Sequence, residues 1–255
     1  MGKEWRTVRK YFSIMWLGLK TTWWKVLIVF AAVAFLDLFI YDRMVISAVE
    51  AGENIPFKKG LDNVVLEFCW MWGIIALILI FRLTGRKGRE QERHTIQRLL
   101  IKENTFIFLN ELYYLLVIIL FWALNVGIIY ILGKWHLDAL GLNMHPSFIN
   151  SLYKNELAQE IIPLGNLPRI IRNITIFYAL SAGCAEGARQ ERYCGTGGRG
   201  LPVFFVAIYV LINCLHYPSG VHMGWNPLTT DPLFIILALV YLVFTKLRMY
   251  REEEY

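Results

Sequence analysis

The residues of this sequence best suited to chemistry are polar side chains that fall inside long apolar runs. Asp37, Glu67, Glu111 and Glu186 are acids at such positions, and Asn125 is an amide within the third run. Charged groups are costly in an apolar environment, so each acid indicates either a function or a partner. Two interpretations stay open: the acids line a polar path or lock helices together, or each pairs with a nearby base close to the end of its run. For Asn125 we expect a hydrogen bond between helices.

The other reactive residue types form no recognisable catalytic or metal-binding motif. No HExxH or CxxC pattern occurs among the five histidines and four cysteines. The segment 195–200, GTGGRG, matches the nucleotide-binding pattern GxGxxG, but it joins two apolar runs instead of a strand and a helix, so a flexible turn is favoured. No GxxxxGK[ST] motif is present. We therefore predict that this chain has no catalytic residue, binds no metal or cofactor, and is not an enzyme.

Composition indicates a polytopic, all-α membrane protein. The 255 residues are 56% hydrophobic and only 18% charged, whereas soluble domains carry about 25% charged residues. Several separate apolar runs approach or exceed the roughly 18 residues that suffice to cross a bilayer. The formal charge of +6 is concentrated beside these runs, which favours the lipid bilayer as a partner and argues against nucleic acid.

Six transmembrane helices are predicted from the apolar runs. They cover residues 23–41, 64–83, 106–133, 170–188, 201–216 and 232–245. The clusters of lysine and arginine at 1–10, 82–102, 189–199 and 246–251 then all lie on one side of the membrane. Because basic segments resist translocation, we expect a multi-pass protein of the cell membrane with both termini cytoplasmic.

The segments between these spans divide a single transmembrane domain, 1–255, into recognisable parts. Within residues 1–22, aromatic and apolar side chains fall on one helix face and basic ones on the other, which favours an amphipathic helix lying at the membrane surface. The alternative is that they form the first turns of one long, continuous membrane helix. The polar stretches 42–63 and 134–169 are expected outside, and the second should carry one or two short helices. Residues 82–105 form a basic cytoplasmic loop, in which 90–101 is expected to be a short helix.

The fourth predicted span is rich in small residues. Ala179, Gly183 and Gly187 recur every four residues and so share one helix face. Missing side chains allow another helix to approach closely, so we expect a helix-packing contact there.

The order of these features resembles the membrane subunit of an ABC exporter of the type-2 permease class. The helix within 1–22 resembles the elbow helix of that family, and the helix at 90–101 resembles its coupling helix. The resemblance implies an ABC ATPase subunit as partner, carrying ATP and magnesium, and a second permease copy or a paralogue. The residues that would contact the ATPase are Arg89, Arg93, Ile96, Leu99 and Leu100.

Two classes of function are therefore carried forward. The first is the transmembrane subunit of an ATP-driven transporter that exports an amphipathic peptide, lipid or drug. The alternative is a membrane-embedded enzyme, or an assembly or scaffold subunit of another membrane complex.

Overall fold

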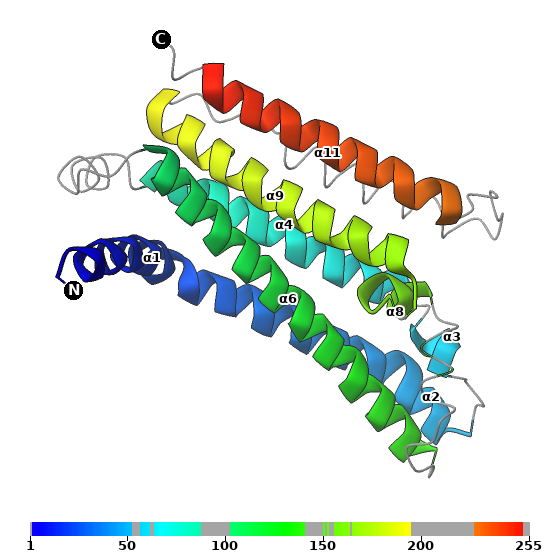
Figure 1. The fold of residues 1–255 in the computed structure, drawn as a ribbon. Helices are drawn as coiled ribbons and strands as arrows, with labels where there is room; N and C mark the ends of the chain where they lie inside the picture. The colour runs from blue at the N-terminus through cyan, green and yellow to red at the C-terminus, as the bar shows by residue number, and fades with distance from the viewer. Residues whose placement is uncertain are drawn as a thin grey trace. The chain divides into compact units, whose positions relative to one another are not determined.

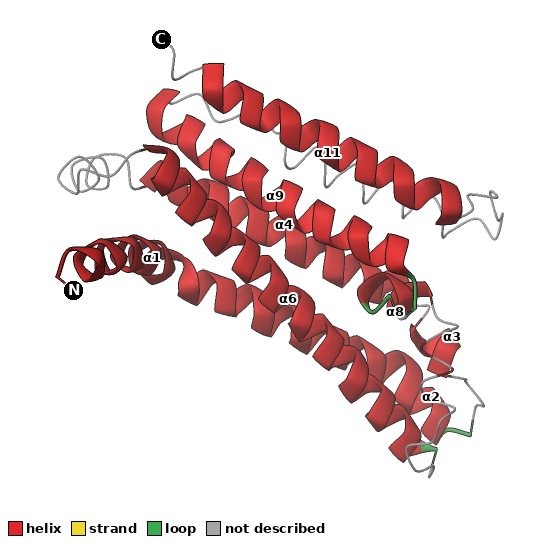
Figure 2. Cartoon of the chain, viewed as in Figure 1, coloured by secondary structure: helices red, strands yellow, loops and turns green. Residues whose placement is uncertain are grey.

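The computed structural model describes residues 2–52, 57–61, 64–87, 103–140, 150, 152, 156–163, 165–194 and 227–251. These residues form helices and short connections, with no strand among them (Figure 2). The long helices are α1 (Gly2–Tyr41), α4 (Val64–Lys87), α6 (Glu103–Ala139), α9 (Leu167–Cys194) and α11 (Pro227–Arg251) (Figure 1). The short ones are the π-helical η1 (Asp42–Ile46), α2 (Ser47–Glu50), α3 (Phe57–Leu61) and α8 (Glu156–Ile161). The all-α prediction is confirmed for this part of the chain.

Two helical stretches within the described residues are long and apolar enough to cross a membrane. They are Thr22–Glu50 and Asn104–Ala139, and they contain the first and third predicted spans. A shorter apolar helix, Phe68–Phe81, lies within the second predicted span. The fourth and sixth predicted spans fall in α9 and α11, and the fifth, at 201–216, lies outside the described residues.

The first apolar helix is longer than the sequence predicted. Residues 42–50 were expected to open an outer polar segment, but η1 and α2 continue the helix to Glu50. Val45, Ile46 and Val49 are buried, and the π-helical turn shifts the helical phase so that these apolar side chains continue the inward face. The helix ends where Gly52 takes a positive φ of 93°, a conformation that favours glycine.

Helix α1 runs without interruption through the predicted surface helix and the predicted first span. Continuous backbone hydrogen bonding is compatible with an amphipathic first part, because amphipathicity depends on side chains and not on a break in the helix. The placement of residues 1–22 at a membrane surface remains a prediction.

The residues pack as two units, and α1, α4, α6 and α9 contribute to both. The first unit comprises Met1–Leu27, Ile75–Ile118 and Arg172–Tyr255. Aromatic rings fill part of it: the Phe81 and Tyr114 rings stack with centroids 4.3 Å apart, and the Tyr113 hydroxyl shares a hydrogen bond with Thr22. These contacts bring residues of α1, α4 and α6 together.

The second unit comprises Ile28–Ile74 and Ile119–Ile171. Its apolar core surrounds Tyr41, which is fully buried, and includes Val45, Phe57, Leu61, Ile128, Leu132 and Ile161. The Tyr41 hydroxyl is 2.9 Å from Nδ1 of His136. Helix α8, within the predicted outer segment 134–169, is tied to α6 because the Trp122 indole donates a 2.6 Å hydrogen bond to the Ile161 carbonyl.

Candidate functional site

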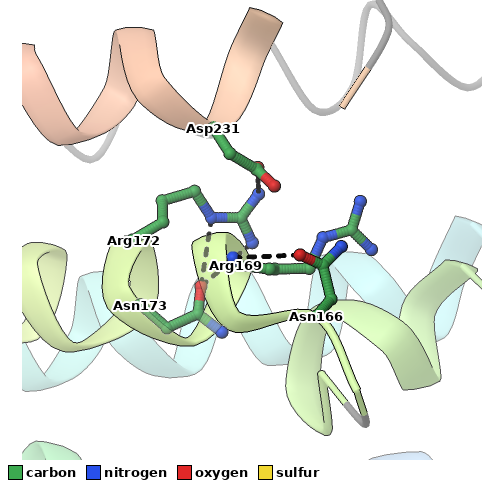
Figure 3. Close-up of polar contacts among 5 residues, drawn as sticks. All are labelled: Asn166, Arg169, Arg172, Asn173 and Asp231. Carbon is green, nitrogen blue, oxygen red and sulfur yellow. Dashed lines mark hydrogen bonds and ion pairs between the residues drawn. The ribbon is translucent and has the colours of Figure 1, made fainter. Parts of the chain in front are cut away.

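The candidate site of the first unit is a set of charged side chains that join the helices α6, α9 and α11. Arg172 of α9 and Asp231 of α11 form an ion pair with 2.7 Å between Nη1 and Oδ1, and their side chains are only 4% and 2% exposed (Figure 3). The Asn173 side chain accepts two more bonds from Arg172, from Nε at 3.2 Å and from Nη2 at 2.9 Å. A buried ion pair needs such additional hydrogen bonds to offset the loss of hydration.

A second charged contact joins α6 to α11. The Lys246 ammonium lies 2.6 Å from Oε2 of Glu111, whose side chain is nearly completely buried, while Lys246 stays partly exposed. The Tyr178 hydroxyl of α9 also donates a hydrogen bond to Glu111. Glu111 therefore contacts both α9 and α11. Helix α11 forms an ion pair with another helix near each of its ends. This geometry joins Glu111 to a base of another helix near the ends of α6 and α11, so it fits both interpretations that stayed open for the predicted acids.

The acids and the amide predicted in the apolar runs differ in their surroundings. The Glu186 carboxylate lies 3.8 Å from the Arg189 guanidinium one turn later in α9, which is a pairing within one helix. Asn125 donates a 2.8 Å hydrogen bond to the Phe121 carbonyl of its own helix, where we had expected a bond between helices. The side chain of Glu67 lies outside the described residues.

Asp37 belongs to the second unit and has a different environment. Its side chain is buried at 5% exposure, and the Cys69 thiol of α4 donates a hydrogen bond to it. Its Oδ1 atom has no hydrogen-bond partner among the described residues. No described lysine or arginine forms an ion pair with it, which distinguishes Asp37 from Glu111.

The small-residue face of α9 is partly explained by α11. Ala179 is completely buried, and a Cβ atom added at Gly183 would collide with the Tyr241 hydroxyl and lie 2.9 Å from Tyr241 Cζ. At Gly187 an added Cβ would meet nothing described within 4 Å. The close approach at this face is therefore to a tyrosine side chain at one position, and it does not extend to Gly187.

Helix α9 begins with a capping interaction in the second unit. The Asn166 side chain accepts a 3.3 Å bond from the backbone N–H of Arg169, three residues later (Figure 3). Asparagine is a favoured residue at such a position because its oxygen satisfies a free N–H of the first turn. The cap places the start of α9 at Leu167, three residues before the predicted span.

Several functional candidates were missed by the sequence reasoning. None of the three is an acid within an apolar run: Arg172 is a base in the fourth predicted span, and Asp231 and Lys246 flank the sixth. Arg172 carried a usable signal, since a base inside a predicted span is as costly as an acid. His136 is hydrogen-bonded to Tyr41.

The residues predicted to contact an ATPase, Arg89, Arg93, Ile96, Leu99 and Leu100, lie outside the described residues. Among the described residues, no group of three His, Cys, Asp or Glu side chains is placed to hold a metal ion. No protein-family model, curated protein or solved structure matches the chain.

Proposed function

We propose that this chain is the transmembrane subunit of an ATP-driven exporter that moves an amphipathic peptide, lipid or drug across the cell membrane. In this proposal six helices cross the membrane, both termini are cytoplasmic, and the chain works with an ABC ATPase and with a second copy or a paralogue. The layout of apolar runs and basic loops supports it, as does the resemblance to type-2 permeases.

The structural observation that carries the proposal is the pairing of buried charged residues between the helices α6, α9 and α11. Asp231 and Lys246 tie α11 to α9 and α6 through Arg172 and Glu111. Charged groups inside apolar helices face the bundle interior and commonly mark substrate paths or moving contacts in transporters. An enzyme would instead be expected to collect its reactive groups around one point.

The test targets the predicted coupling helix at 90–101. Replacing both Ile96 and Leu99 with Asp places charges on its apolar side, which a partner would have to bury. We expect the tagged double variant to reach the membrane but to lose an ATPase subunit that co-purifies with the parent chain in detergent. Mass spectrometry identifies that subunit by its Walker A sequence, and vanadate-sensitive ATP hydrolysis reports its activity.

A matched control adds the same two charges to polar positions of the same segment, as Thr95→Asp with Gln97→Asp. This variant should keep the partner. Retention of the ATPase by the Ile96/Leu99 variant would contradict the coupling role and favour contact of this segment with lipid headgroups. Absence of any ATPase from the parent preparation would favour the alternative, an assembly or scaffold subunit or a membrane-embedded enzyme.

A further inference from the structure

Asp37 lies near the middle of the apolar helical stretch Thr22–Glu50. In the predicted span, residues 23–41, this acid is only four residues from the second end. The continuation through η1 and α2 moves that end to Glu50 and leaves Asp37 more than ten residues from either end of the stretch. A long flexible base can reach the water layer from such a depth, but an aspartate is too short to do so.

The inward face of α1 places Asp37 between two buried apolar side chains. Val33, Asp37 and Tyr41 follow one another at four-residue spacing and are all buried. The large side chains of Phe35, Leu36 and Phe39, on the rest of the helix, are exposed. Asp37 therefore occupies a position on the buried face of α1 at which an apolar residue would be expected.

Among the described residues, the ionisable groups that face the interior of this unit leave Asp37 without a counter-charge. From α4 the facing group is the Cys69 thiol, which hydrogen-bonds to the carboxyl group. From α6 it is His136, which is hydrogen-bonded to Tyr41, the ionisable group on the same face of α1. The base nearest in sequence, Arg43, is exposed and lies over the Phe39 ring.

Comparison with Glu111 shows what this arrangement implies. Glu111 is as deeply buried, but its carboxylate has an ammonium group 2.6 Å away, whereas Asp37 has no such neighbour among the described residues. An ionised carboxylate that is buried without a cation costs several kcal/mol, so such a group holds a proton instead. In the neutral acid, one oxygen lacking a hydrogen bond is a much smaller cost than an unpaired charge.

We propose that Asp37 is a proton-binding site inside the helical packing of the second unit. The carboxyl group holds a proton while α1 and α4 are packed at Cys69. When that contact opens to water, the O–H bond breaks, its electron pair stays on the carboxylate, and the proton passes to water. This inference rests on the membrane placement of α1 but not on the ATPase partner, and it adds a proton as a ligand of the chain.

The test uses dicyclohexylcarbodiimide, an apolar reagent that reacts with protonated carboxylic acids. The purified full-length chain is labelled in detergent over a pH series from mildly acidic to mildly alkaline, and adducts are located by peptide mass spectrometry. We expect an adduct on Asp37 that decreases as pH rises, by about tenfold per pH unit once the proton is lost. Glu111 serves as an internal control with less adduct expected, because this buried carboxylate has the Lys246 ammonium 2.6 Å away.

Two variants sharpen the assignment. Asp37→Asn keeps the shape of the side chain and should abolish the adduct, while Cys69→Ala should keep it, because the thiol orients the carboxyl group but does not supply its proton. Labelling of a denatured sample shows that the reagent can reach the peptide. No adduct on Asp37 in the folded chain, labelling that does not change with pH, or equal labelling of Glu111 would each overturn the proposal.

A second measurement does not depend on reagent access. If the folded chain binds a proton at Asp37 that the unfolded chain releases, stability must fall as pH rises through the range in which the folded chain loses it. The parent chain should therefore show a thermal unfolding midpoint that falls toward alkaline pH, and Asp37→Asn should reduce that fall. An identical pH dependence in both proteins would contradict proton binding. Loss of ATPase co-purification would leave both results unchanged, so the two proposals fail separately.

Discussion

The contact between α9 and α11 at Gly183 can be tested by adding a single carbon atom. In Gly183→Ala the new Cβ would collide with the Tyr241 hydroxyl and lie 2.9 Å from Cζ and 3.1 Å from Cε1 of the same ring. Overpacking of this kind costs about 1–3 kcal/mol. Alanine is favoured over glycine in a helix by about 1 kcal/mol, which opposes the loss. Because the collision is severe but involves a side-chain end that can move, we expect a net destabilisation of about 1–2 kcal/mol.

Gly187→Ala is the matched control for this substitution. It makes the same change one helical turn later, where nothing described lies within 4 Å of the new atom. Here only the helix preference remains, so the variant should be as stable as the parent or more stable by up to about 1 kcal/mol. The difference between the two variants, about 2–3 kcal/mol, isolates the tertiary contact from the local effect of losing a glycine.

A double-mutant cycle identifies the colliding group. Tyr241→Phe removes the hydroxyl and leaves the ring, so Gly183→Ala should cost about 1 kcal/mol less in that background than in the parent. Unfolding of the purified chain in mixed micelles, followed by circular dichroism over a detergent titration, provides the free energies. Equal stability of the two alanine variants, or no coupling between positions 183 and 241, would refute the assigned contact between these helices.

Two further substitutions test the charged contacts of the first unit. Asp231→Asn leaves the buried Arg172 without its carboxylate and should destabilise the chain by about 3 kcal/mol. This is the lower end for a broken buried ion pair, because the Asn173 side chain still accepts hydrogen bonds from Arg172. Recovery of stability in a double variant with Arg172→Leu, measured by the same unfolding assay, would confirm that the isolated charge is the cause. Lys246→Met should cost about 1–3 kcal/mol because it leaves the buried Glu111 without a cation, while Lys246→Arg should cost less; equal losses for the two would show that Glu111 does not depend on the charge.

Much of the fold was predictable from residue type and spacing. Apolar runs indicated helices that could cross a membrane. Helices cover five of the six predicted spans, and the remaining one, 201–216, lies outside the described residues. The prediction was weakest at helix ends. The polar stretch from residue 42 was expected to follow the helix, but the helix continues to Glu50, because Val45, Ile46 and Val49 bury apolar surface there. The polarity of neighbouring residues in the sequence does not report the free energy gained by burying these side chains.

Sequence alone also located Asp37 and Glu111 as unusual, since an acid within an apolar run is costly wherever its neighbours lie. Only the tertiary structure decided that they differ. Glu111 meets Lys246, which is 135 residues away in the chain, whereas Asp37 meets a thiol and, among the described residues, no base. The apolar pattern of a helix indicates its buried face, but not which residue of another helix lies opposite. That choice depends on how the helices pack, so only the tertiary structure determines whether a buried acid has a base beside it.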